Sequence, residues 1–271
     1  MPGWALTEVR VYGDGGPVVF VLHGGPGGPG YMATLAGELG NWFRAVEVLQ
    51  RTGVEGGLSV SRHTDDLRDC VAEHGAGQPA LILGHSWGAM LALAYGAAYP
   101  DGLGGIMLVG SGTFDVPSRR RLAELRNQRL GESGRAMMAR LMASGLSAAD
   151  RMKREVGLLF KADSHDLAEL GSPVTAFDRV GHDGSWDSMI ALQEGGTYPA
   201  AYGAIACPVL MVHGDLDPHP GAMIRDSLTP HMPQLEYVEL ERCGHYPWLE
   251  RHARDRFYEK AREWLLLQAS L

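Results

Sequence analysis

Cysteine and lysine are scarce in this 271-residue chain. Its three cysteines, Cys70, Cys207 and Cys243, form no Cys-x-x-Cys pair. An odd number of widely spaced cysteines argues against a disulfide framework and indicates thiols in a reducing compartment. Lysine supplies only three of the 24 basic residues, against 32 acidic ones, and the net charge is −8. Because a phosphate backbone attracts cationic proteins, this balance argues against a nucleic-acid partner.

Long hydrophobic runs are also missing. The first strongly apolar run covers residues 18–22, which is the length of a strand. A membrane span needs roughly 20 such residues. The N-terminus has no basic stretch followed by a long apolar segment, so we expect no signal peptide and no membrane contact. A cytoplasmic location is therefore the expectation.

Strand and helix patterns alternate over most of the chain. Strands are predicted over residues 6–12, 18–22, 43–49, 81–83, 106–109, 208–212 and 235–240. Helices are predicted over residues 62–74, 89–94 and 257–265. Such alternation is typical of an α/β fold with a mainly parallel central sheet flanked by helices. The uniformly apolar run 18–22 fits a strand buried on both faces.

The strand pattern stops in the middle of the sequence. Residues 119–129 predict a charged helix, and residues 135–142 predict a helix rich in methionine. We therefore predict a helical cap over residues 114–200, inserted before the late strands. The core would comprise residues 1–113 and 201–271, which is a reasonable size for one hydrophobic core. The sequence does not indicate the oligomeric state.

A serine at a strand-to-helix junction is the most informative chemical feature. Gly84-His-Ser-Trp-Gly88 joins a predicted buried strand to an apolar helix. The pattern Gly-x-Ser-x-Gly at such a junction raises the serine hydroxyl above the end of the strand, with the glycines permitting a sharp turn. Serine is a poor nucleophile unless a base removes its proton. The spacing therefore predicts that Ser86 is the nucleophile of a hydrolase.

The base and the acid are expected in loops after late strands. A histidine base needs a carboxylate that holds its tautomer and stabilises the imidazolium. In this fold the chain order is serine, acid, histidine. Asp217 follows the strand 208–212 and His245 follows the strand 235–240. We predict Asp217 as the acid and His245 as the base, with Asp215 as the alternative acid.

Two backbone amides should hold the negative oxygen of the tetrahedral intermediate. One is expected from Trp87, directly after the nucleophile. The other is expected from Gly25 in the glycine-rich stretch His23-Gly-Gly-Pro-Gly-Gly28, where no side chain obstructs the amide.

These motifs together resemble the α/β-hydrolase fold, and within it most closely the proline iminopeptidase group. That group's oxyanion loop typically reads His-Gly-Gly-Pro-Gly, as residues 23–27 do, and Gly84-His-Ser-Trp-Gly88 and Gly244-His245 match as well. The resemblance implies an α/β-hydrolase core with a helical cap. It also implies Ser86, Asp217 and His245 as the catalytic triad and Gly25 and Trp87 as oxyanion donors.

Two stretches depart from the group that the chain resembles. Its members usually carry Asp-Gln-Arg-Gly-x-Gly after the third strand, where this chain has Leu49-Gln-Arg-Thr-Gly53. Their lid usually carries Trp-x-x-Trp-Glu, and here only Ser185-Trp186-Asp187 is similar. The resemblance thus implies a proline iminopeptidase-like hydrolase. A carboxylesterase or lactonase for a small apolar acyl group, and a non-catalytic ligand receptor, stay open as alternatives.

Two other stretches contain residue types found in cofactor or metal sites. Residues 25–30 match Gly-x-Gly-x-x-Gly, but Pro26 and Pro29 lack the amides that a dinucleotide phosphate would need. The stretch 213–219 contains metal-ligand types without a regular face. We therefore expect no cofactor and no metal, and a small molecule or short peptide as substrate. An aminopeptidase would need a lid carboxylate for the substrate amine, and Glu132, Glu155 and Glu194 are the candidates.

Overall fold

The computed structural model describes residues 7–53, 57–168 and 178–270. Its centre is a seven-stranded sheet in the order β1-β3-β2-β4-β5-β6-β7. The strands are β1 (Glu8–Tyr12), β2 (Val18–Leu22), β3 (Arg44–Leu49), β4 (Ala80–His85), β5 (Leu103–Val109), β6 (Val209–Gly214) and β7 (Leu235–Leu240). Only the edge strand β1 is antiparallel to its neighbour. The predicted mainly parallel sheet is confirmed.

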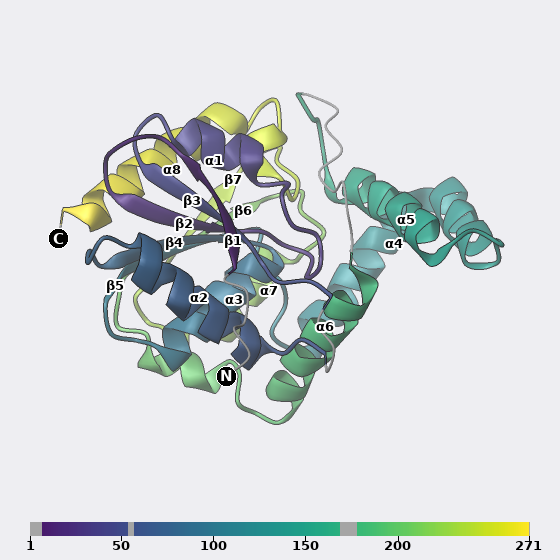
Figure 1. The fold of residues 1–271 in the computed structure, drawn as a ribbon. Coiled ribbons are helices and arrows are strands. Elements are labelled where there is room, and N and C mark those ends of the chain that lie inside the picture. Colours follow the sequence, from purple (N-terminus) through teal and green to yellow (C-terminus); the bar gives the residue numbers. More distant parts are fainter. Residues whose placement is uncertain (1–6, 54–56, 169–177, 271) are drawn as a thin grey trace.

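Helices cover both faces of the sheet (Figure 1). On one face lie α1 (Ala33–Leu39) and α8 (Arg254–Ala269), and on the other α2 (Val60–His74), α3 (Trp87–Ala98) and α7 (Gly221–Leu228). Strands β2, β4 and β6 are buried along their whole length. Burial on both faces explains why their sequences are nearly continuous apolar runs rather than alternating ones.

A helical insertion separates β5 from β6, as predicted. It contains α4 (Val116–Met142), α5 (Ala148–Asp163) and α6 (Arg179–Glu194), and the short helix η1 (Ala200–Ala204) follows it. The two helices predicted over residues 119–129 and 135–142 both fall within α4. Non-helical torsions at Gly131 (φ 61°, ψ −172°) divide it between them, a conformation that glycine adopts readily.

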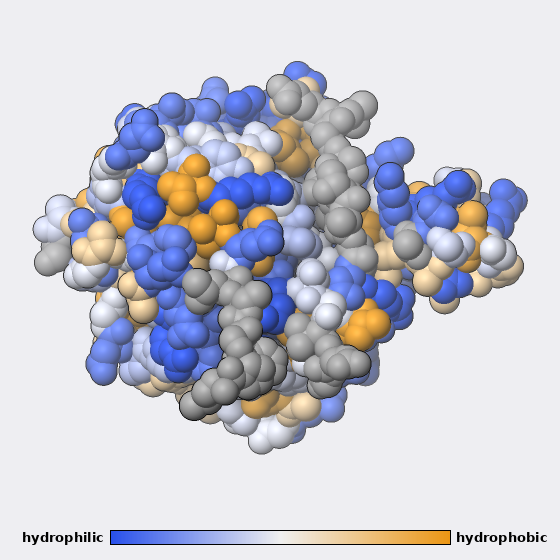
Figure 2. Space-filling model, in the orientation of Figure 1, coloured by the Kyte–Doolittle hydropathy of each residue, from blue (hydrophilic) through white to orange (hydrophobic). Residues whose placement is uncertain are grey.

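The outer part of α4 and α5 projects from the body of the protein (Figure 1). Its surface mixes hydrophilic and hydrophobic side chains (Figure 2), and Met137 and Met142 are among the exposed apolar residues. Among the described residues, no helix has both the length and the apolar character that crossing a membrane requires.

Candidate active site

Ser86 lies at the tight junction between β4 and α3. Its own backbone is left-handed (φ 54°, ψ −115°), which costs about 1–3 kcal/mol for a residue with a side chain. The glycines on either side serve close packing instead. A Cβ on Gly84 would lie 2.2 Å from the Gly88 oxygen, and a Cβ on Gly88 would lie 2.4 Å from the Leu22 oxygen. The sequence pattern therefore lets the helix approach the sheet, and the strain of the turn falls on the serine.

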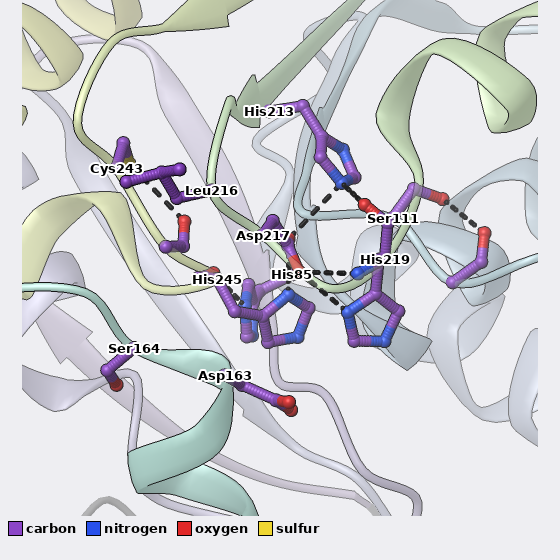
Figure 3. Close-up of polar contacts among 12 residues, drawn as sticks. His85, Ser111, Asp163, Ser164, His213, Leu216, Asp217, His219, Cys243 and His245 are labelled. Atoms are coloured by element: carbon purple, nitrogen blue, oxygen red, sulfur yellow. Dashed lines mark hydrogen bonds and ion pairs between the residues drawn. The ribbon is translucent and has the colours of Figure 1, made fainter. Parts of the chain in front are cut away.

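The structure brings Asp217 and His245 together from two loops. His245 Nδ1 lies 2.7 Å from Asp217 Oδ2, and both side chains are buried (Figure 3). Asp215, the alternative acid, instead accepts a hydrogen bond from the Cys243 amide at 3.0 Å. At the end of β5, a Cβ on Gly110 would lie 2.9 Å from His245 Nδ1. This glycine leaves the space that the imidazole occupies.

Three histidines surround the Asp217 carboxylate. Besides His245, the His219 amide and its Nδ1 each lie 2.8 Å from Oδ1, and His213 Nε2 lies 3.2 Å from Oδ2 (Figure 3). Burial alone would raise the pKa of Asp217, but attraction to His245, His219 and His213 outweighs it and holds the pKa well below its usual range. The carboxylate is therefore ionised and accepts hydrogen bonds on both oxygens.

The glycine-rich loop and the start of α3 present two unengaged amides. Gly25 (φ 49°) and Trp87 both line the cavity at Ser86. Within the described residues neither amide donates a hydrogen bond. Gln50 braces both segments, because its Oε1 accepts from Trp87 Nε1 at 2.9 Å and its Nε2 donates to the His23 oxygen at 2.7 Å. Sequence reasoning missed this role of Gln50, although a polar residue directly after a buried strand is a signal for it.

A second brace connects the glycine-rich loop to the loop of His245. The Gly24 amide donates to the Tyr31 hydroxyl oxygen at 2.6 Å, and this hydroxyl lies 2.6 Å from His85 Nδ1. His85 Nε2 lies 2.9 Å from the His245 carbonyl oxygen. Because a carbonyl only accepts, Nε2 carries the proton and Nδ1 accepts from Tyr31. Burial lowers the pKa of His85 well below its usual value, which keeps this arrangement neutral.

A cavity of about 470 Å³ lies between Ser86 and the helical insertion. This volume suits a small molecule. Ser86, His245 and His219 line its floor. The insertion supplies the opposite wall with Leu122, Arg126, Met152, Glu155, Val156, Leu159, Phe160, Asp163, Arg179, His182, Asp183 and Trp186. Helices α4, α5 and α6 therefore define which groups can reach the serine.

The charged residues of this wall differ in how they are paired. Arg126 Nε lies 2.8 Å from Asp163 Oδ1, and Arg179 Nε lies 2.7 Å from Asp183 Oδ2. Glu155 is different, since its Oε1 is buried without a hydrogen-bond partner and Arg151 Nε is 4.0 Å from it. Glu132 and Glu194, the other two lid carboxylates proposed from the sequence, do not line the cavity.

The loops after β6 and β7 together contain a potential metal-binding group. One ligand atom each from Asp217, His219 and His245 lies within 4.8 Å of the others. In this structure the Nδ1 atoms of both histidines are hydrogen-bonded to the carboxylate. The geometry therefore suits a hydrogen-bond network that holds protons.

Comparison with known proteins gives one family and many similar folds. The model of the alpha/beta hydrolase family matches residues 18–259. A thermophilic esterase from Thermogutta terrifontis has 23% identity and a TM-score of 0.65, over 97% of this chain and 93% of that one. The enol-lactonase from Burkholderia xenovorans has 20% identity and a TM-score of 0.64, over 96% of both chains. The proline iminopeptidase of Mycobacterium smegmatis has 17% identity and a TM-score of 0.63, over 96% and 94%. At these identities the likeness shows the fold alone.

Proposed function

Because the chain belongs to the alpha/beta hydrolase family, we propose that it is a serine hydrolase that works through an acyl-enzyme. The proposal rests on one observation. Ser86 and His245 line the same cavity, with Ser86 on a strained turn and His245 hydrogen-bonded to Asp217. Among the described residues the Ser86 hydroxyl makes no hydrogen bond, either to His245 or to any other group, so proton transfer to His245 Nε2 requires the two side chains to come within hydrogen-bond distance when substrate binds.

Each residue then has one task. Ser86 Oγ attacks the substrate carbonyl carbon while its proton passes to His245 Nε2, and Asp217 holds the proton on Nδ1. The Gly25 and Trp87 amides stabilise the oxyanion. His245 gives its proton to the leaving group, which departs and leaves an acyl-serine. Water then repeats the sequence, releasing the acid and restoring the serine.

An ester of a small apolar acid is the substrate class that the cavity supports best. The wall opposite Ser86 includes Leu122, Met152, Val156, Leu159 and Phe160. Arginines donate hydrogen bonds to two of its three carboxylates, and Arg151 lies 4.0 Å from the third, that of Glu155. Since burial of a protonated amine costs free energy unless a carboxylate pairs with it, this lining favours an acyl group of a carboxylic ester or lactone.

One observation favours an aminopeptidase as a second candidate. Glu155 Oε1 is buried at the cavity without a hydrogen-bond partner. A substrate ammonium group would satisfy it. A proline iminopeptidase-like activity requires such a lid carboxylate. Trp186, which lies on the same wall, is part of the partial match to the Trp-x-x-Trp-Glu lid segment.

Two substrates and two variants separate these proposals. We expect p-nitrophenyl butyrate to be cleaved faster than prolyl-naphthylamide, and Ser86→Ala to abolish both activities and labelling by a fluorophosphonate. Glu155→Gln should leave butyrate cleavage within about threefold, because it conserves shape and removes only charge. A selective loss of prolyl-naphthylamide cleavage in Glu155→Gln would establish the second candidate. Undiminished labelling of Ser86→Ala would refute the proposed nucleophile.

A further inference from the structure

A second imidazole lies beside His245 in the cavity. The rings of His219 and His245 are stacked, with centroids 4.1 Å apart and planes 12° from parallel (Figure 3). Both residues are buried. Since the ionised carboxylate only accepts, both Nδ1 atoms donate to Asp217, His219 to Oδ1 and His245 to Oδ2. Two histidines thus contact one acid in nearly the same way, whereas the reaction needs one base.

An arginine of the helical insertion, Arg126, contacts the His219 imidazole at its outer nitrogen. Arg126 Nη2 lies 3.5 Å from His219 Nε2. Because Nδ1 of His219 carries its proton toward Asp217, Nε2 accepts from the guanidinium, and the positive charge disfavours a proton there. Burial and the neighbouring His245 lower the pKa of His219 to about 4, against the attraction of Asp217 and with a further lowering from Arg126.

The same part of the insertion contacts both histidines. Arg126 lies on α4 and is ion-paired with Asp163 at the end of α5. The Asp163 carbonyl oxygen accepts a hydrogen bond from the His245 amide at 2.8 Å. The groups that face His219 are Asp217 and His245 from the loops after β6 and β7, His213 in β6, His85 at the end of β4 and Arg126 on α4, with Asp163 behind the arginine.

We propose that His219 is a positioning residue, which fixes the Asp217 carboxylate through the oxygen that His245 does not use, and that Arg126, by donating to His219 Nε2, leaves His245 alone to take the Ser86 proton. This inference rests on the proposed function. It also gives the helical insertion a role beyond substrate selection, because an insertion residue determines which imidazole acts as the base.

The direction of the effect follows from the shared carboxylate. A hydrogen bond from His219 Nδ1 stabilises the charge on Asp217 and weakens its attraction for the His245 imidazolium. Without this donor, Asp217 attracts the imidazolium form of His245 more strongly. The acid limb of the pH profile of kcat/KM reports protonation of the catalytic base in the free enzyme. This limb should then move to higher pH.

A matched pair of variants tests this. His219→Phe keeps a flat ring against His245 but removes the donor, whereas His219→Asn removes the ring and offers an amide N–H near the position of Nδ1. We expect His219→Phe to lose about tenfold or more in kcat with KM within about twofold, and to shift the acid limb upward. His219→Asn should recover most of kcat. Wild-type kcat with an unshifted limb in His219→Phe, or no recovery in His219→Asn, would overturn the inference.

A second measurement does not depend on turnover. By NMR of ¹⁵N-labelled histidine, His219 of the wild type should stay neutral with its proton on Nδ1 down to about pH 5. In Arg126→Gln/Asp163→Asn, which removes both members of the ion pair, it should take up a proton at higher pH. A proton on Nε2, or wild-type titration near the ordinary pH of histidine, contradicts the inference. A wild type with the expected titration but no hydrolysis or fluorophosphonate labelling contradicts the proposed function instead.

Discussion

Replacing Asp217 by asparagine is the sharpest test of the proposed triad. The side chain keeps its size but has one accepting oxygen and one amide donor. Oδ1 of the native carboxylate receives two hydrogen bonds from His219, so we expect the asparagine oxygen to stay on that side. The amide nitrogen then faces His245 Nδ1, where Oδ2 now accepts at 2.7 Å.

This exchange places the His245 proton on the wrong nitrogen. Two donors cannot share a hydrogen bond, so His245 must accept at Nδ1 and carry its proton on Nε2. Nε2 is the atom that has to receive the Ser86 proton. A misplaced tautomer of this kind costs about 10⁴-fold in kcat, or about 5.5 kcal/mol at 1.36 kcal/mol for each factor of ten.

The assay compares p-nitrophenyl butyrate hydrolysis by Asp217→Asn and Asp215→Asn. The second variant is the matched control, because the asparagine oxygen can still accept the Cys243 amide that Asp215 binds at 3.0 Å. We expect its kcat to stay within about threefold of the wild type. Cooperative thermal melting of both variants shows that they fold. If Asp217→Asn keeps kcat within tenfold of the wild type, or Asp215→Asn loses as much as Asp217→Asn, the assignment of the acid is wrong.

Three further predictions concern stability. Gly88→Ala should lower the free energy of unfolding by about 3 kcal/mol or more, because its Cβ would meet a backbone oxygen at 2.4 Å; an unchanged urea midpoint contradicts this. Tyr31→Phe should cost about 2–4 kcal/mol, since the Gly24 amide and His85 Nδ1 lose the hydroxyl that both contact; equal midpoints for variant and wild type would refute it. Burial lowers the pKa of His63 to about 4, below the value of about 6.5 in an unfolded chain. The unfolded chain therefore binds the proton first. The contribution of His63 to the free energy of unfolding is fully present above about pH 6.5 and is lost as the pH drops toward 4, by up to about 1.4 kcal/mol per pH unit. Urea midpoints at pH 7 and 5 should differ less in His63→Gln than in the wild type, and an equal difference would contradict this.

The strands were predictable from the sequence because of how they are buried. Residues 18–22 and 209–214 lie inside the sheet with both faces covered, so selection for apolar side chains acts on every position. The elbow and the two late loops were predictable because each is attached to such a strand. By contrast, α5 and α6 were not predicted individually, since exposed positions in an insertion tolerate charge and the apolar pattern is diluted.

The wall of the cavity could not be predicted from the sequence. Arg126 and Glu155 lie on helices whose sequences contain no recognisable motif, and many similar charged residues nearby face solvent. Which ones turn inward depends on how α4 and α5 pack against the core. The stacked rings of His219 and His245 belong to residues 26 positions apart in the sequence. The only indication of this cluster in the sequence was the stretch 213–219, which contains several residue types that bind metals.

The amino-acid sequence was enough to predict the succession of strands and helices, the serine turn and the loops that carry Asp217 and His245, because these features depend on local backbone geometry and on burial. Three features emerge only in the folded chain: His245 contacts Asp217 rather than Asp215, three histidines surround one carboxylate, and arginines donate hydrogen bonds to two carboxylates of the helical insertion. Those outcomes depend on distances between segments far apart in the chain, and such distances are fixed only when the helical insertion packs over the end of the sheet.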